Sequence, residues 1–186
     1  MMRPANTPVS RWTDADFESL SWHDCTIHSM GLDQDGESQN DLVLDLDFLM
    51  EWLPAPEGTF RFRVAPALLR FHNVDKLAIH TLLDYKQSMD ISEVTRLRRD
   101  DPGYTNFHWV IKLHTYPGRA NQVEFDATGF SQELTAQPII TDGQSFQLGE
   151  RLQMIRENGE PGAAPNGGPA TQSGNSEVTE GPPSVS

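Results

Sequence analysis

The sequence predicts a mainly β protein (β-rich α+β): an antiparallel sheet, curled or folded into a sandwich, with a short N-terminal helix and a C-terminal helix. Apolar and polar residues alternate in several segments. In residues 41–48 the leucines fall on one side and the aspartates on the other. Period two is typical of a strand with one buried and one wetted face. Turns rich in Gly, Pro and Asp separate these segments, and helix signals occur only near the two ends.

The N-terminal helix is predicted to begin at Thr13, a suitable N-cap with Asp16 three residues later. A first strand follows over residues 24–32. A loop at 33–38 then leads into a second strand from 41 to about 52.

After a Pro-rich turn at 54–58, a third strand is predicted over 59–64. Pro66 is expected to interrupt it, because proline cannot donate a hydrogen bond to a neighbouring strand. Further strands are predicted at 68–73, 76–83, 91–98, 107–114 and 123–127. Ser145 is expected to cap a helix over 146–156, in which Gly149 costs about 1 kcal/mol relative to Ala.

These elements predict three parts of the chain. Residues 1–11 form a flexible N-terminal arm, and residues 12–156 form a single β-rich domain. Residues 157–186 form a disordered acidic tail rich in Gly, Pro and Ser, with six Gly and five Pro. The tail has too few large apolar residues to offset an ordering cost of about 1–2 kcal/mol per residue.

The composition and net charge of the chain limit the classes of molecule that it is expected to bind. Hydrophobic residues make up 37%, and the formal net charge is -13. The tail contributes four acids and no Lys or Arg, which leaves -9 for residues 1–156. Such a charge repels nucleic acid and anionic membrane surfaces and favours a basic protein partner.

Cys25 is the single cysteine, so an intramolecular disulfide and a zinc site built on several thiolates are excluded. The N-terminus lacks the apolar segment of a signal peptide. No run approaches the roughly 18 apolar residues of a membrane helix. A cytoplasmic protein is expected.

The first group of chemically interesting residues is Trp22, His23 and Asp24, followed by Cys25 and His28. On a strand, His23 and Asp24 point to opposite faces, and Asp24 lies about 13 Å from His28. A metal chelate needs its donors within about 2.0–2.2 Å of one ion. This strand alone therefore cannot hold a metal, and a ligand would have to come from elsewhere. Packing and backbone hydrogen bonds are the preferred interpretation, with Cys25 a buried, inert thiol.

The second group is Asp45, Asp47 and Glu51, on the polar side of the second strand. Same-side neighbours are roughly 7 Å apart, a spacing that suits a divalent cation with help from a neighbouring strand, or a pair of hydrolytic carboxylates. Arg61 and Arg63 are predicted to oppose these acids in a hairpin. Cross-strand ion pairs are preferred to catalysis as the explanation.

The remaining ionisable residues add no catalytic motif. His108, Lys112 and His114 are predicted to pair with Glu124 and Asp126 across a hairpin. The alternative of a metal shared by His72 and His80 is disfavoured. No phosphate-binding loop, dinucleotide fingerprint, metalloprotease helix or nucleophile elbow occurs. The sequence thus predicts no catalytic residue, no metal ligand set and no cofactor.

Several segments carry a resemblance to a known family. They are Phe17-x-x-Leu20-Ser21-Trp22-His23-Asp24, Leu44-Asp45-Leu46-Asp47-Phe48-x-x-Glu51-Trp52, Val64-Ala65-Pro66-Ala67-x-Leu69-x-Phe71-His72-Asn73-Val74 and Gly129-Phe130-x-Gln132. Over residues 12–155 the chain resembles a family of small uncharacterised bacterial proteins, some of them similar to immunity proteins of polymorphic toxin systems. The resemblance implies no catalytic residue.

Three functions follow as hypotheses. The preferred one is a non-enzymatic acidic binding module, of the immunity type, that neutralises a basic toxin. The second is a metal-dependent or carboxylate-based hydrolase, and the third is a self-associating structural domain. The candidate binding residues are Trp22, His23, Asp24, Asp45, Asp47, Glu51 and Trp52.

Overall fold

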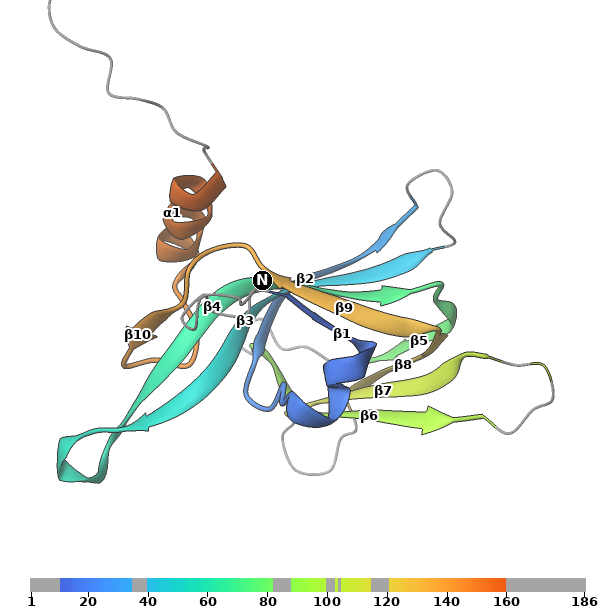
Figure 1. Cartoon of the computed structure of the whole chain (residues 1–186), viewed down its shortest axis with the longest axis horizontal. Coiled ribbons are helices and arrows are strands. Elements are labelled where there is room, and N and C mark those ends of the chain that lie inside the picture. The colour runs from blue at the N-terminus through green and yellow to red at the C-terminus, as the bar shows by residue number, and fades with distance from the viewer. Residues whose placement is uncertain are drawn as a thin grey trace, which may run out of the picture.

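A computed structural model describes residues 11–34, 40–81, 88–99, 103, 105–114 and 121–159. In these residues ten antiparallel strands form one sheet, and one α-helix follows it (Figure 1). The predicted mainly β antiparallel architecture is confirmed. Residues 1–10 of the predicted arm and residues 160–186 of the predicted tail lie outside the described residues.

The strands vary from three to fourteen residues in length. Their bounds are β1 Arg11–Thr13, β2 Thr26–Asp33, β3 Asp41–Pro54, β4 Phe60–His72, β5 Asp75–His80, β6 Met89–Arg98, β7 Phe107–Leu113, β8 Gln122–Ala127, β9 Gly129–Leu134 and β10 Ile139–Thr141. The helical elements are the 3-10 turns η1 Asp14–Ser19 and η2 Pro56–Gly58 and the helix α1 Leu148–Gly159. No helix in the described residues is long and apolar enough to cross a membrane.

The order of the strands is β1-β9-β4-β3-β2-β6-β7-β8-β5, with β10 pairing separately with β4. The prediction of a curled sheet or sandwich is wrong. The strands make one sheet instead of two, because β2 pairs with β3 on one side and with β6 on the other, and this sheet is neither curled nor closed. The β2–β6 joint is only two residue pairs long, Thr26 with Asp90 and Ile27 with Met89.

Aromatic side chains join strands that lie on either side of β2 in this order. The Phe71 ring on β4 lies 5.0 Å from Trp109 on β7 and 4.7 Å from Phe125 on β8. Phe17 and Phe130 add edge contacts with Trp109. Burial of these rings supplies much of the apolar area removed from water on folding.

The N-terminal helix is present only as a 3-10 turn. Thr13 and Asp16 make the predicted capping box, with the Thr13 N–H 2.8 Å from Asp16 Oδ2. The turn ends after six residues, where Leu20 is already extended. So short a segment gains too few hydrogen bonds to continue as an isolated α-helix.

Pro66 does not interrupt β4, which runs from Phe60 to His72. The Pro66 carbonyl accepts a hydrogen bond from the N–H of Thr135, so its ring nitrogen points to the same side. On that side β10 pairs no further than Val64, and β9 begins pairing at Ala67. Pro66 lies in the gap between them, where no donor is required.

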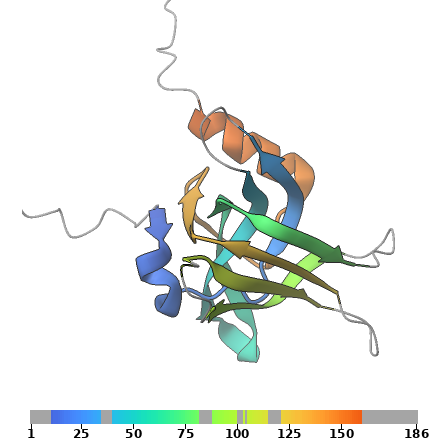
Figure 2. The ribbon, with the colours of Figure 1, turned by 90° about the vertical axis from the view of Figure 1, so that its right-hand side faces the viewer.

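Helix α1 lies on the opposite side of the β3–β4 pair from the aromatic core. Figure 1 shows it apart from strands β5 to β8, and in Figure 2 the orange helix lies across the top of the strands. Arg151 of α1 contacts Asp45 and Asp47 of β3, while Leu44 and Leu46 on the other face are fully buried in the core. The predicted polar face of β3 is thus partly covered by the helix.

Candidate functional site

The segment before β2 brings Trp22, His23 and Asp24 into quite different surroundings. Trp22 is buried against Phe17 and Phe130, and its indole N–H donates to Gln132 Oε1 at 2.6 Å. His23 is exposed and Asp24 is partly buried. Trp22 is therefore a core residue, and the polar chemistry of this segment belongs to its two neighbours.

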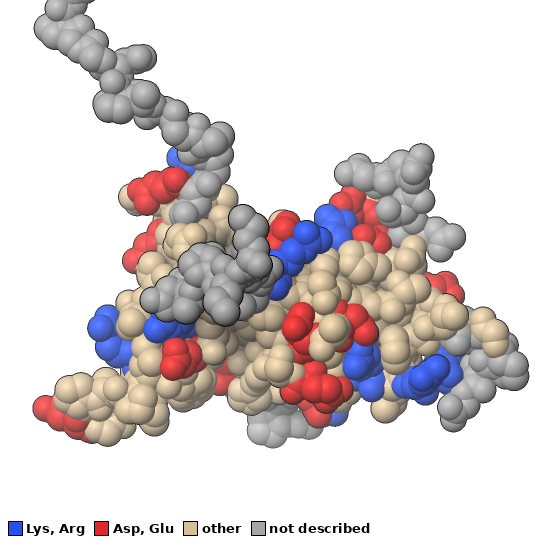
Figure 3. All heavy atoms as spheres, viewed as in Figure 1, with Lys and Arg blue, Asp and Glu red and all other residues tan. Residues whose placement is uncertain are grey.

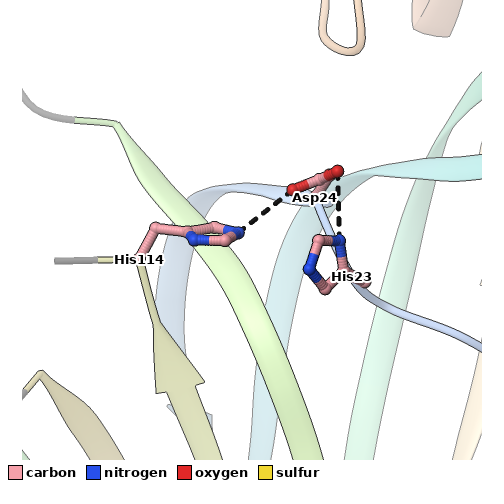
Figure 4. A group of neighbouring side chains, drawn as sticks. All are labelled: His23, Asp24 and His114. Atoms are coloured by element: carbon pink, nitrogen blue, oxygen red, sulfur yellow. Dashed lines mark hydrogen bonds and ion pairs between the residues drawn. The ribbon is translucent and has the colours of Figure 1, made fainter.

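His23 and Asp24 meet a third residue, His114, which directly follows β7 (Figure 4). We call these three residues the His-Asp-His cluster. Asp24 Oδ2 lies 3.0 Å from His23 Nδ1, and Asp24 Oδ1 lies 3.0 Å from His114 Nε2. The two imidazole rings meet edge to face with centroids 5.3 Å apart. The expectation that His23 and Asp24 face opposite ways does not apply, because both precede β2 and Asp24 has a positive φ of 65°.

Strand β6 fixes the backbone of the cluster from both sides. The Asp24 N–H donates to the Ile91 carbonyl at 2.8 Å, and the His114 N–H donates to the Asp90 carbonyl at 2.8 Å. Asp90 and Ile91 are adjacent, so one dipeptide positions residues that lie 90 positions apart in the chain. Gln144 adds a longer contact, 3.4 Å from its Nε2 to Asp24 Oδ2.

Asp45 and Asp47 are held by Arg151 of α1. Its Nε lies 2.9 Å from Asp47 Oδ1, and its Nη1 lies 2.9 Å from Asp45 Oδ2. The predicted pairing of these acids with Arg61 and Arg63 is wrong, because the register places Asp45 opposite Leu68 and Asp47 opposite Pro66.

The Asp47 side chain is completely buried. It also accepts a hydrogen bond from the Phe146 N–H and lies 2.8 Å from His28 Nε2. Burial by itself raises the pKa of Asp47. The hydrogen bonds from His28, Phe146 and Arg151 outweigh it and hold the pKa below its ordinary value. These contacts make Asp47 an anchor for α1 rather than a group open to a substrate.

Glu51 and Trp52 lie near the end of the β3–β4 hairpin. Glu51 pairs with Arg63 at 3.1 Å, as the sequence predicts, and Arg61 pairs instead with Asp142 at 3.0 Å. Trp52 lies on the other face against Phe60 and Phe62, with ring centroids 5.6 and 5.0 Å away. The hairpin therefore has one ionic face and one aromatic face.

Two further aspartates are held by basic side chains. Asp126 contacts Arg99 at 2.7 Å, His108 at 3.0 Å and Lys76 at 3.2 Å. The predicted pairing of His108 with Asp126 is thus present, whereas Lys112 pairs with Glu93.

Asp41 contacts Arg70, His72 and the N–H of Asn73. Burial raises the pKa of Asp41, but these hydrogen bonds lower it more, and the pKa lies below its usual value. His72 is engaged by Asp41 and Ser131 rather than by His80.

An apolar cavity of about 390 Å³ opens between β2, β3 and strands β5 to β8. Its apolar lining is provided by Met30, Leu32, Leu42, Leu77, Ile79, Met89, Leu113 and Val123. The Thr81 hydroxyl also lines it and has no hydrogen-bond partner among the residues that the structure describes. A cavity of this size and lining can accommodate a small apolar group.

Cys25 is expected to be unreactive in the folded protein. It is fully buried, its sulfur accepts from the Leu49 N–H at 3.3 Å, and burial raises its pKa to about 12. The thiolate is the reactive form, so a disulfide reagent at pH 8 should label no thiol in native protein and one thiol per chain in denaturant. Labelling of the native protein at the rate of a free thiol would contradict this burial.

The fold and the contacts define a mainly β antiparallel protein with an anchored C-terminal helix and several carboxylate clusters. No family model, no curated protein and no solved structure matches this chain. Its function is therefore inferred from its own residues.

Sequence reasoning identified His23 and Asp24 but missed His114 as their partner, and it missed Arg151 altogether. Both contacts join residues about 90 to 106 positions apart. No local pattern in the sequence marks either residue. The one signal is that Asp45 and Asp47 of β3 have no basic residue opposite them on β4, so a basic side chain from another segment is required to pair with them.

Proposed function

We propose that this protein is a non-catalytic binding module that docks a basic protein partner. One observation carries the proposal: an exposed aromatic surface at the end of the β3–β4 hairpin, which extends away from the rest of the sheet in Figure 1. We call Trp52, Phe60, Phe62 and Ile139 the hairpin patch.

The register places the hairpin patch on one face. Trp52 pairs with Phe62 across the hairpin, and Ile139 of β10 pairs with Val64, two residues along from Phe62. Trp52 and Phe60 are each 48% exposed, and Ile139 is 44% exposed. Aromatic side chains are enriched at protein interfaces and dominate their energetics. An exposed cluster of them at a projecting tip therefore favours docking.

The charge of the chain supports a basic partner. The formal net charge of -13 favours encounter with a cationic protein and disfavours nucleic acid and anionic membranes. Figure 3 shows the end of the hairpin as mostly uncharged surface with acidic atoms at its tip. Within this class we favour an immunity-type role in which the partner is a basic toxin acting in the cytoplasm.

The hydrolase alternative receives less support. It requires Asp45, Asp47 and Glu51 to act together on a substrate or ion. Arg151 holds the first two, and Arg63 holds the third. Carboxylates neutralised by arginine in this way are typical of structural ion pairs.

The test is affinity capture with the full chain in three forms: the wild type, the double variant Trp52→Ala/Phe60→Ala, and the single variant Leu97→Ala as its control. Leu97 is an exposed apolar residue on β6, away from the hairpin. We expect a basic protein to be captured by the wild type and by Leu97→Ala, and to bind the double variant at least about 30-fold more weakly once purified, since truncating one central aromatic residue costs about 2 kcal/mol or more.

Increasing salt should slow association with the wild type if charge steers the encounter. Equal capture by all three proteins would overturn the docking role of the hairpin patch. Capture of no basic protein by any of them would overturn the proposed function.

A further inference from the structure

We propose that the His-Asp-His cluster binds one divalent transition-metal ion, with Zn²⁺ as the best fit. His23, Asp24 and His114 each offer one donor atom, and these atoms all lie within 4.8 Å of one another. In the described residues, this is the group of three or more His, Cys, Asp or Glu side chains whose donor atoms lie close enough together to hold a metal ion. The proposal stands independently of the hairpin patch.

The geometry requires only a small closure. Two ligands at about 2.1 Å from a tetrahedral ion lie about 3.4 Å apart. The two 3.0 Å contacts of Asp24 go to different oxygens, Oδ2 for His23 and Oδ1 for His114, so the carboxylate turns as the two imidazoles close on a shared ion. Both histidine side chains are about half exposed, and rotation about their side-chain bonds can supply the adjustment without moving the backbone.

Hydrogen bonds to β6 hold the backbone of two of the three candidate ligands in place. Asp24 and His114 are both hydrogen-bonded to the start of β6, through Ile91 and Asp90. Asp24 adopts a left-handed φ of 65°, a conformation that non-glycine residues adopt uncommonly and that aspartate and asparagine tolerate best. Its carboxylate thereby reaches both imidazoles, which come from segments distant in the sequence.

The charge around Asp24 also differs from that around the structural aspartates. Asp41, Asp47 and Asp126 each contact an arginine. In the described part of the chain, Asp24 is paired with imidazoles and an amide, and with no Lys or Arg. A metal ion would provide the compensating charge here.

The donor set selects the kind of ion. Two imidazole nitrogens and one carboxylate oxygen suit Zn²⁺, as well as Co²⁺ and Ni²⁺, and are poor ligands for Ca²⁺. Each imidazole would bind through the nitrogen that now faces Asp24, and the proton on that nitrogen would move to the other ring nitrogen or to water. Three protein ligands leave a fourth position for water or an outside donor. Gln144, 3.4 Å from Asp24, would help to orient the carboxylate.

The test measures Zn²⁺ affinity of the untagged full chain by competition with a chromophoric chelator. We expect one Zn²⁺ per chain. His114→Gln and Asp24→Asn should each weaken binding by at least about tenfold, because even outer partners of a metal site contribute 10–100-fold. The matched control is His80→Gln, an exposed histidine of β5 that should leave the affinity unchanged.

Co²⁺ supplies a second readout. Bound Co²⁺ should show the intense visible absorption of a four-coordinate site in the wild type, and this absorption should be lost in His114→Gln. Asparagine tolerates the backbone of Asp24, so a native circular dichroism spectrum is expected for Asp24→Asn and confirms that lost binding is not lost folding. The proposal is overturned if the wild type binds no Zn²⁺, or if His80→Gln weakens binding as much as His114→Gln does, which indicates adventitious binding by surface histidines.

Discussion

Replacing Asp47 with alanine is expected to lower the free energy of unfolding by about 3–5 kcal/mol, because it leaves buried cationic and donor groups without their partner. The Asp47 side chain has no exposed surface and contacts Arg151, His28 and the Phe146 N–H. Two of these contacts belong to α1 or to the segment just before it. We therefore expect chemical denaturation to show both lower stability and a loss of helical signal before the sheet unfolds.

Asp45→Ala is the matched control. Asp45 binds the same Arg151, but its side chain is 30% exposed, so its loss should cost only about 1 kcal/mol. Arg151→Met in the Asp47→Ala background should recover part of the lost stability, since it removes the unpaired guanidinium. A stability of Asp47→Ala within about 1 kcal/mol of the wild type would contradict the anchoring role of Asp47.

The pH dependence of stability offers an independent check of the same contacts. The pKa values of Asp47 and Asp41 are both held below their ordinary value in the folded protein. A lowered folded-state pKa contributes stability that is fully present above the unfolded pKa of about 3.9 and is lost as the pH falls through the folded value. The denaturant concentration at the midpoint of unfolding should therefore decrease as the pH is lowered below about 4. The decrease should be less steep in Asp47→Ala than in the wild type.

The sequence was sufficient to predict the strands that have a clear period of two. The segments around Leu44, Trp109 and Phe125 lie in β3, β7 and β8, and their apolar residues are buried as the alternation indicates. The β3–β4 hairpin and its Glu51–Arg63 pair also followed from local spacing. These features depend on neighbours in the chain, which a single sequence reveals.

The features that sequence reasoning missed depend on distant segments. The three-residue strands β1 and β10 are too short to show a period, and they form only because β9 and β4 offer free edges. Pro66 is tolerated in β4 because of where β9 and β10 stop. Within the candidate sites, His114 and Arg151 approach Asp24 and Asp45 only through the fold.

Replacing Phe71 with alanine is expected to cost about 3–5 kcal/mol of unfolding free energy, as is typical of a buried phenylalanine. Phe71 is fully buried and contacts the rings of Phe130 on β9, Trp109 on β7 and Phe125 on β8. The β2–β6 joint is only two residue pairs long, so contacts through Phe71 carry much of the cohesion between β4 on one side of β2 and strands β7 and β8 on the other. Thermal and urea unfolding of the variant should report a lower midpoint, together with weaker near-ultraviolet dichroism from Trp109.

Phe60→Ala makes the same chemical change at an exposed site. Phe60 is 48% exposed at the hairpin end, so its loss should change the unfolding free energy by less than about 1 kcal/mol while weakening capture of the proposed partner. The two variants thus separate the side of β4 that holds the protein together from the side that is proposed to bind. Similar destabilisation by Phe60→Ala and Phe71→Ala would mean that the hairpin patch is part of the folded core, and the docking proposal would lose its basis.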